Sequence, residues 1–244
     1  PAYAQPVTAS SQTRGLVTWM QTKVLGTSTY TYTVNIYDDK ARLIQVKSKN
    51  FTGGADISTT QYSWSGQPLV TLQKQVKATT PAQTGFIITK FTYDDLGRLL
   101  QTDKKVQHTH VNSNTLPAAF TTTSKNEYDA LGQLKKKNMG NKPGAPAGTP
   151  LTKMEYQYNI RGWLLNINKS YMAATNADQY FSMELGYVKP SSLGTYAVPQ
   201  FNGNIAGVLW KSEGDQEKRK YNFTYDAANR ITPGVFTQFV SGSG

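Results

Sequence analysis

Four aspartates directly follow a tyrosine, and they are the side chains of this chain best suited to general acid or base chemistry. They are Asp38, Asp94, Asp129 and Asp226. A carboxylate catalyses proton transfer only when a nucleophile, a second acid or a metal ion completes the site. The sequence contains no G-x-S-x-G elbow, no H-E-x-x-H pair and no glycine-rich phosphate loop. We therefore expect no catalytic residues and interpret the aspartates as side chains that cap tight turns.

Other side chains permit binding chemistry. Arginines follow three of these aspartates by four residues, at Arg42, Arg98 and Arg230. They could bind an anion, but the pattern favours stacking on aromatic rings or pairing with turn aspartates of adjacent units. The four tryptophans could form a sugar-binding platform or serve as half-buried packing anchors. They are Trp19, Trp64, Trp163 and Trp210.

Metal and cofactor chemistry has little support in the sequence. His108-Thr109-His110 would point two imidazoles the same way on a strand, but no third ligand lies nearby. The chain has no cysteine, which excludes disulfides and thiolate metal sites. We expect no metal and no cofactor.

The stretch Phe91–Leu100, FTYDDLGRLL, predicts a strand, a tight turn and a return strand. Its aromatic and β-branched residues suit a pleated surface, and Asp94 can accept the backbone N–H two residues on. Gly97 would supply the positive φ that closes a type I turn with a G1 bulge.

The same strand–turn–strand pattern recurs along the chain. The tyrosines step by 25, 31, 35 and 30 residues from Tyr37 to Tyr158, and the gap of 67 to Tyr225 has room for a further degenerate unit. The unit that begins at Tyr62 is a weaker copy. Such self-similarity predicts a repeat architecture in which each unit packs on its neighbours. The turn residues are Tyr37, Asp38, Arg42, Leu43, Tyr93, Asp94, Gly97, Arg98, Leu99, Tyr128, Asp129, Gly132, Leu134, Tyr158, Gly162, Leu164, Tyr225, Asp226, Asn229, Arg230 and Ile231.

YDDLGRL and YDALGQL resemble the tyrosine–aspartate (YD) repeats of bacterial Rhs proteins, and the segments 181–187 and 201–210 resemble their inter-repeat spacers. The resemblance covers roughly 30–231. It implies an all-β fold of repeated antiparallel hairpins in a large coiled sheet that is part of an Rhs-type shell. It also implies a secreted or cell-surface location. In polymorphic toxins such a shell encloses an effector. The Asp-Pro-x-Gly-Leu autoprotease motif of that family is absent from this sequence, so cleavage and toxicity are not carried over.

Composition limits the remaining possibilities. The chain has 244 residues and a net charge of +11. The positive charge could serve to bind an anionic partner, or the lysines could simply protect sheet edges from aggregation. No apolar run is long enough to span a membrane. We expect a non-catalytic structural segment whose partners are other segments of the same polypeptide or a shell or secretion component. The alternative is a surface module that binds a glycan or another anionic surface, and a nucleic-acid partner is disfavoured.

The expected organisation has three parts: a lead-in or linker at 1–28, the YD-repeat sheet at 29–235 and a tail at 236–244. Within the lead-in, residues 14–25 could form a strand or a short helix. Residues 171–178 are expected to form a polar connector and 189–200 a long loop. Because Pro1 is not a methionine and neither flank is an obvious cap, we expect a piece of a longer protein whose edge strands pair with something else.

Overall fold

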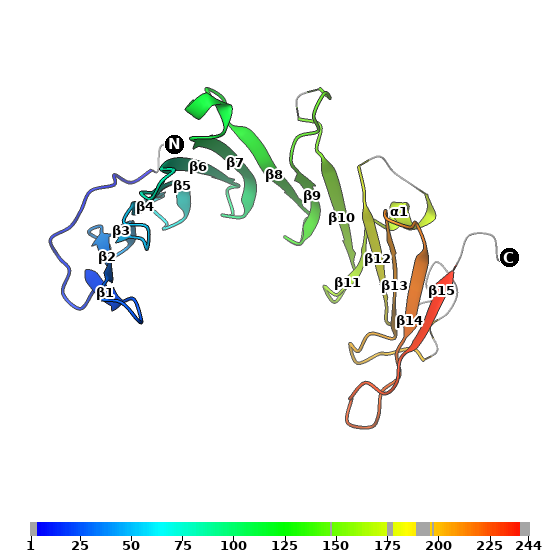
Figure 1. Ribbon diagram of the computed structural model, residues 1–244. Coiled ribbons are helices and arrows are strands. Elements are labelled where there is room, and N and C mark those ends of the chain that lie inside the picture. Colours follow the sequence, from blue (N-terminus) through cyan, green and yellow to red (C-terminus); the bar gives the residue numbers. More distant parts are fainter. Residues whose placement is uncertain (1–3, 147, 175–177, 189–195, 197, 240–244) are drawn as a thin grey trace. The chain divides into compact units, whose positions relative to one another are not determined.

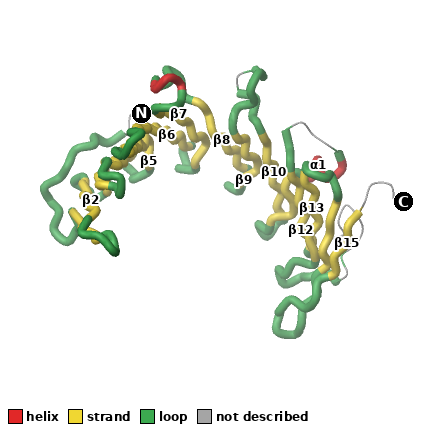
Figure 2. Tube along the Cα trace, viewed as in Figure 1, coloured by secondary structure: helices red, strands yellow, loops and turns green. Residues whose placement is uncertain are grey.

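The computed structural model describes residues 4–146, 148–174, 178–188, 196 and 198–239, and these residues form an all-β fold. In this described part of the chain, fifteen antiparallel strands follow one another, and their order in the sheet is their order in the chain. Within each of the two units described below, Figure 1 shows the strands beside one another in chain order. Helical structure in the described residues amounts to one 3-10 turn and one five-residue α-helix (Figure 2). The predicted architecture of repeated antiparallel hairpins is confirmed.

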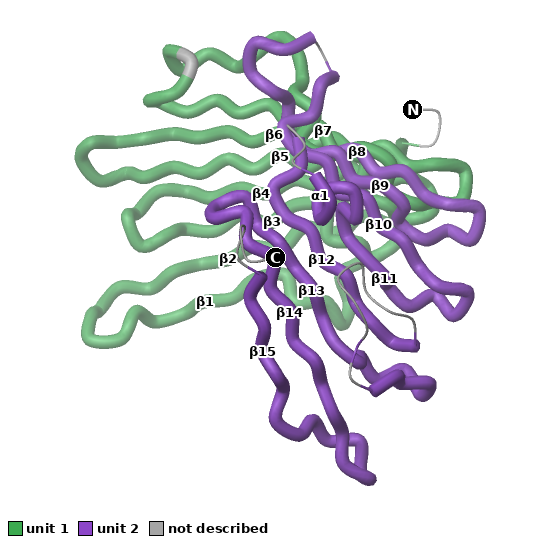
Figure 3. The backbone as a smooth tube through the Cα atoms, turned by 90° about the vertical axis from the view of Figure 1, so that its right-hand side faces the viewer, with its two compact units in different colours: residues 1–124 green, residues 125–244 purple. Residues whose placement is uncertain are grey.

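Two compact units make up the chain, residues 1–124 and residues 125–244 (Figure 3). Their boundary falls inside strand β8 (Thr121–Tyr128). The first unit contains β1 (Trp19–Lys23), β2 (Tyr30–Tyr37), β3 (Leu43–Lys49), β4 (Ala55–Tyr62), β5 (Pro68–Lys77), β6 (Gln83–Tyr93), β7 (Leu99–His108) and η1 (Asn112–Asn114). The second unit contains β9 (Leu134–Met139), β10 (Thr152–Tyr158), β11 (Leu164–Ile167), α1 (Lys169–Ala173), β12 (Phe181–Gly186), β13 (Gly207–Ser212), β14 (Lys218–Asn222) and β15 (Val235–Phe239).

The first unit is a single layer of sheet. Within its described residues, Ile44 is the one buried apolar side chain. Tyr30, Tyr32 and Val34 share one face of β2, as their alternation predicts, and each is 39–44% exposed. The ladder of backbone hydrogen bonds and the contacts at the turns therefore hold this unit together, without a packed second layer.

The second unit has a small covered core. Tyr171 and Met172 of α1 are almost fully buried, and Leu209 of β13 has no exposed surface. The predicted polar connector at 171–178 is thus wrong at its start, because Tyr171 and Met172 gain the free energy of burying apolar surface. Residues 175–177 lie outside the described part of the chain.

A glycine pair in this core accommodates an aromatic ring. Gly186 of β12 and Gly207 of β13 stand opposite each other in the ladder. A Cβ on Gly186 would lie 1.8 Å from the Tyr196 ring, and one on Gly207 would lie 2.3 Å from it. Only residues without a side chain allow Tyr196 to rest on these strands.

Two of the expected segment boundaries do not coincide with the ends of strands. The lead-in at 1–28 contains β1, so residues 14–25 supply a strand and not a helix. The boundary expected between 235 and 236 lies within β15. The long loop expected at 189–200 lies largely outside the described residues. No helix in the described part of the chain is long and apolar enough to cross a membrane.

Candidate functional site

The repeat turns are the candidate site, and each is closed by the residue that follows the tyrosine. In the central turn, Oδ1 of Asp94 accepts hydrogen bonds from the backbone N–H groups of Leu96 at 3.0 Å and Arg98 at 2.8 Å. The N–H of Gly97 donates to the Asp94 carbonyl oxygen at 3.0 Å. The predicted capping role of Asp94 is therefore confirmed, and the backbone occupies Oδ1.

Other side chains perform the same capping in the divergent turns. Oδ1 of Asn159 accepts bonds from the N–H groups of Arg161 at 2.9 Å and Trp163 at 3.0 Å. The hydroxyl of Ser63 accepts a bond from the N–H of Gln67 at 3.0 Å. A short side chain with an acceptor oxygen is thus what the position requires, and a negative charge is not needed.

The fourth turn position adopts a left-handed backbone in each repeat. Its φ is 80° at Gly97, 82° at Gly132 and 78° at Gly162. Asn229 and Ala41 occupy the same position with φ values of 60° and 58°. The turn therefore forms without glycine, and Ala41 carries a strain of about 1 kcal/mol.

The repeat arginines pair with the aspartate of their own turn. The distance from Nε to Oδ2 is 2.7 Å for Arg42 and Asp38 and 2.6 Å for Arg98 and Asp94. Arg230 makes the equivalent 2.7 Å contact with its own aspartate. The predicted pairing with aspartates of adjacent units is wrong, because a four-residue spacing across this turn brings the two side chains together.

These contacts lower the pKa of the carboxyl groups that the arginines pair with. Burial acts to raise the pKa of Asp38, but hydrogen bonds from the Arg42 side chain and from the N–H groups of Arg42 and Lys40 outweigh it and lower that pKa. The pKa of Asp226 is lowered as well, chiefly by the N–H and the guanidinium of Arg230. A general acid needs a carboxyl that holds its proton near neutral pH, so these aspartates have the opposite property.

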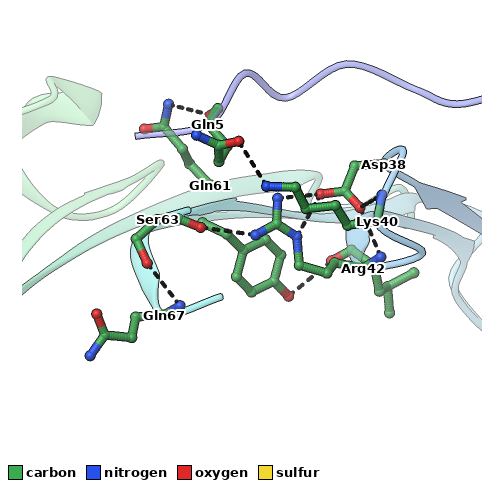
Figure 4. A network of polar contacts seen from close by, with 9 residues as sticks. Gln5, Asp38, Lys40, Arg42, Gln61, Ser63 and Gln67 are labelled. Carbon is green, nitrogen blue, oxygen red and sulfur yellow. Dashed lines mark hydrogen bonds and ion pairs between the residues drawn. The ribbon is translucent and has the colours of Figure 1, made fainter. Parts of the chain in front are cut away.

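Arg42 also links its turn to the next one, as Figure 4 shows. Its Nη1 donates to the carbonyl oxygen of Ser63 at 2.9 Å, and its guanidinium lies 5.1 Å from the centre of the Tyr62 ring. The predicted stacking of a repeat arginine on an aromatic ring is thus confirmed at Arg42. Asp38 is nearly fully buried in this network.

The N-terminal lead-in crosses the same two turns. The N–H of Gln5 donates to the Tyr62 carbonyl oxygen, and the N–H of Ser10 donates to that of Tyr37, both at 2.8 Å. The Gln5 side chain accepts a bond from Lys40 at 3.1 Å (Figure 4). The described part of the lead-in is therefore hydrogen-bonded to the first two repeat turns.

The repeat tyrosines tie each hairpin to the preceding one, a role that the sequence analysis did not identify. The hydroxyl of Tyr93 donates to the carbonyl oxygen of Pro68 at 2.8 Å, and that of Tyr158 donates to Leu134 at 3.0 Å. In each case the acceptor is the residue six positions after the previous repeat tyrosine. The same spacing relates Tyr62 to its acceptor Leu43.

The same bond locates the degenerate unit expected between Tyr158 and Tyr225. The hydroxyl of Tyr187 donates to the carbonyl oxygen of Leu164 at 3.1 Å, and that of Tyr225 donates to Ile205 at 2.8 Å. Tyr187 and Ile205 therefore flank the turn of the hairpin formed by β12 and β13. Tyr187 lies 29 residues after Tyr158, so the tyrosine spacing could have identified it.

The remaining sequence candidates are spread over the fold. Trp163 packs against Tyr187 with ring centres 5.1 Å apart, and Trp210 stacks on Tyr221 at 5.8 Å. Trp64 stays 70% exposed at a turn. The rings of the two histidines lie 5.7 Å apart, and the described residues contain no group of three or more side chains suited to a metal ion.

No family model and no curated protein matches this chain. Among solved structures it is similar to TcdB2-TccC3-TEV, with a TM-score of 0.40 and 13% identity over 86% of this chain. It is also similar to TcdB2-TccC3 without its hypervariable C-terminal region, with a TM-score of 0.43 and 14% identity over 84% of this chain. A third is the Tc holotoxin pore of Photorhabdus luminescens with a substitution in TccC3, with a TM-score of 0.31 and 13% identity over 86%. This chain spans 10%, 10% and 9% of their respective lengths.

Proposed function

We propose that this chain is a non-catalytic structural segment of a secreted or cell-surface Rhs/YD-repeat protein, and that it contributes to a β-shell that encloses or presents an effector. The observation that carries the proposal is the hydroxyl bond from a repeat tyrosine to the preceding hairpin, which recurs at Tyr62, Tyr93, Tyr158, Tyr187 and Tyr225. A contact repeated at this spacing serves the extension of a sheet, which is what a scaffold requires.

The use of the turn side chains supports a non-enzymatic role. In both Asp94 and Asp38, one carboxylate oxygen accepts hydrogen bonds from backbone N–H groups and the other accepts one from an arginine. An acid or base committed in this way has no oxygen directed at a substrate. In this proposal the YD motif recurs because it closes turns and joins hairpins, and its aspartates have no catalytic role.

Activity assays and cell fractionation test this function together. The purified chain should cleave neither nucleic acid nor glycan, and the protein should be found in the medium or on the surface of the cells that produce it. Turnover that survives rigorous purification and disappears in Asp94→Asn would contradict the non-enzymatic role. A protein confined to the cytosol would contradict the location.

A glycan-binding surface is a second candidate, and Trp64 is the observation that favours it. The exposed ring borders a hollow of about 670 Å³ lined by Ser65, Gln67 and Lys90 among others, and Lys40 Nζ lies 5.3 Å from the ring centre. An exposed aromatic face with polar neighbours suits the stacking of a sugar ring. A glycan array separates the two functions. A pure scaffold gives no signal, whereas a glycan module gives one that is lost in Trp64→Ala.

A further inference from the structure

One face of the sheet in the first unit carries alternating apolar and lysine side chains. The ladder places Trp19 opposite Val34, Val34 opposite Lys47, and Lys47 opposite Ile57. The row continues through Lys74 to Phe86. Side chains directly opposite in an antiparallel ladder share a face, so this row crosses six strands on one side. We call this side of β1–β7 the lysine face.

Charge is distributed very unequally between the two faces of β1–β7. The register puts six of the lysines of these strands on the lysine face, namely Lys23, Lys47, Lys49, Lys74, Lys90 and Lys105. The acidic residue there is Asp103, which is buried and bonded to Gln101 and Thr122. The opposite face carries Lys77, Lys104 and Asp56. Its rows are mostly polar, such as Thr60, Thr71 and Thr89, and one row ends in Ile87 and Val106.

The described residues of the first unit do not bury the apolar side chains of the lysine face. Trp19 is 59% exposed and Val34 is 42% exposed, while Ile57, Leu72 and Phe86 are half-buried. Apolar side chains that stay accessible on neighbouring strands are typical of an interaction site. The lysines around it select the charge of what binds.

The second unit shows how the protein covers a similar surface. Lys211 and Lys220 lie in its covered core, on the same face of the sheet as Leu209. Lys211 Nζ lies 4.7 Å from the centre of the Tyr171 ring and donates to the Tyr171 carbonyl oxygen at 3.3 Å. Lys220 Nζ lies 4.8 Å from the centre of the Tyr196 ring. A covering segment in this protein thus presents aromatic rings and oxygen atoms to the lysines.

We propose that the lysine face docks an acidic polypeptide segment that contains aromatic residues. The carboxylates of the segment would neutralise Lys47, Lys74 and their neighbours, and its rings would cover the apolar side chains between them. This inference rests on the proposed scaffold function and specifies the chemistry of what the scaffold holds.

A polypeptide fits this face better than a nucleic acid does. The side chains between the lysines are largely aliphatic, such as Val34, Ile57 and Leu72, whereas single-stranded nucleic acids are bound by stacking on aromatic platforms. The strands β1–β7 also contain no arginine, the residue that reads phosphates and bases through paired bonds. Binding of an oligonucleotide is therefore an outcome that counts against the proposal.

Fluorescence anisotropy with the full chain tests this docking surface. The probe is a labelled 14-residue peptide of alternating Glu and Tyr, compared with a Lys–Tyr peptide, a Glu–Ser peptide and an oligothymidine of similar length. The double variant Lys47→Glu/Lys74→Glu disrupts the lysine face. The matched control Lys77→Glu/Lys104→Glu makes the same change in net charge on the opposite face. Circular dichroism and thermal melting verify that both variants fold. If Lys47→Glu/Lys74→Glu does not fold, Lys47→Gln/Lys74→Gln is used in its place.

The proposal predicts that the Glu–Tyr peptide binds more tightly than the other probes. The lysine-face variant should weaken that binding about tenfold or more, and the opposite-face control should change it less than about twofold. Equal losses in the two variants, no binding of the Glu–Tyr peptide, or tighter binding of oligothymidine through Lys47 and Lys74 would overturn it. None of these results would affect the scaffold function, which the activity assays and fractionation test separately.

Discussion

The hydroxyl of Tyr93 donates a 2.8 Å hydrogen bond to the backbone carbonyl oxygen of Pro68, and this bond joins two successive hairpins. Burial raises the pKa of Tyr93, so the hydroxyl keeps the proton that it donates. Tyr93 belongs to the hairpin of β6 and β7, whereas Pro68 starts the return strand of the hairpin before it. The tyrosine of the YD motif therefore acts between repeats, and the aspartate acts within one.

We expect Arg42→Ala to destabilise the protein more than Arg230→Ala. The Arg42 side chain is 17% exposed and bonds Asp38 and the Ser63 carbonyl oxygen, so its loss leaves nearly buried partners unsatisfied at a cost of about 1–2 kcal/mol. The Arg230 side chain is 80% exposed, and surface ion pairs contribute little to stability. Urea unfolding measures both variants. Equal shifts in the two midpoints would refute the bridging role of Arg42.

Stability should fall in acid partly through Asp38. Its pKa is lowered in the folded state, so its contribution is present above the unfolded value near 4 and is lost as pH falls through the lower folded value. Asp38→Asn should therefore lose less stability than wild type between about pH 5 and pH 2. Thermal melting over that range measures the slope, and Asp39→Asn at the exposed neighbouring position is the control. A wild-type slope in Asp38→Asn would count against this assignment.

Gly97→Val should be more damaging than Asp95→Ala in the same turn. Gly97 has a φ of 80°, and its Cβ would lie 2.8 Å from the side-chain nitrogen of Gln67. A β-branched residue in this conformation costs about 1–3 kcal/mol. Asp95 is exposed and stands at a permissive turn position. Similar small losses of denaturant midpoint in the two variants would show that the turn does not need its left-handed residue.

Gly186→Ala should destabilise the second unit strongly, because the added methyl group would overlap the Tyr196 ring. Gly214→Ala is the matched control, since a Cβ there has no neighbour within 4 Å. Gly186→Ala should lower the free energy of unfolding less in a Tyr196→Ala background than in the wild type, because the ring that the methyl group overlaps is then gone. Strictly additive effects in this double-mutant cycle would mean that the ring does not rest on Gly186.

The hairpins could be predicted from the sequence because the contacts that form their turns lie between residues close together in the chain. Asp94 and Gly97 fix a turn through contacts within five residues, and the positive φ of Asn229 follows from the same frame. The Tyr93–Pro68 bond could not be predicted, since it depends on the register between strands that belong to different hairpins.

Burial explains what the sequence analysis missed in the second unit. Residues 169–173 are too few to show a helical period, and their helix exists because Tyr171 and Met172 pack on β12 and β13. The role of Gly186 could not be predicted either, because its partner Tyr196 lies ten residues further along the chain and no local pattern relates the two. Arg42 was assigned to the wrong aspartate for a simpler reason, since the tight turn folds Asp38 back onto it.

Hydrogen exchange on Tyr93→Phe tests most directly whether the repeat tyrosine couples successive hairpins. The substitution removes one hydroxyl and leaves the turn at Asp94 intact. We predict that amide protection falls in β6 and β7 and also in the preceding hairpin of β4 and β5, while β1 and β2 keep wild-type rates. The exposed Tyr30→Phe is the control and should change none of them. Wild-type protection of β4 and β5 in Tyr93→Phe would contradict the account.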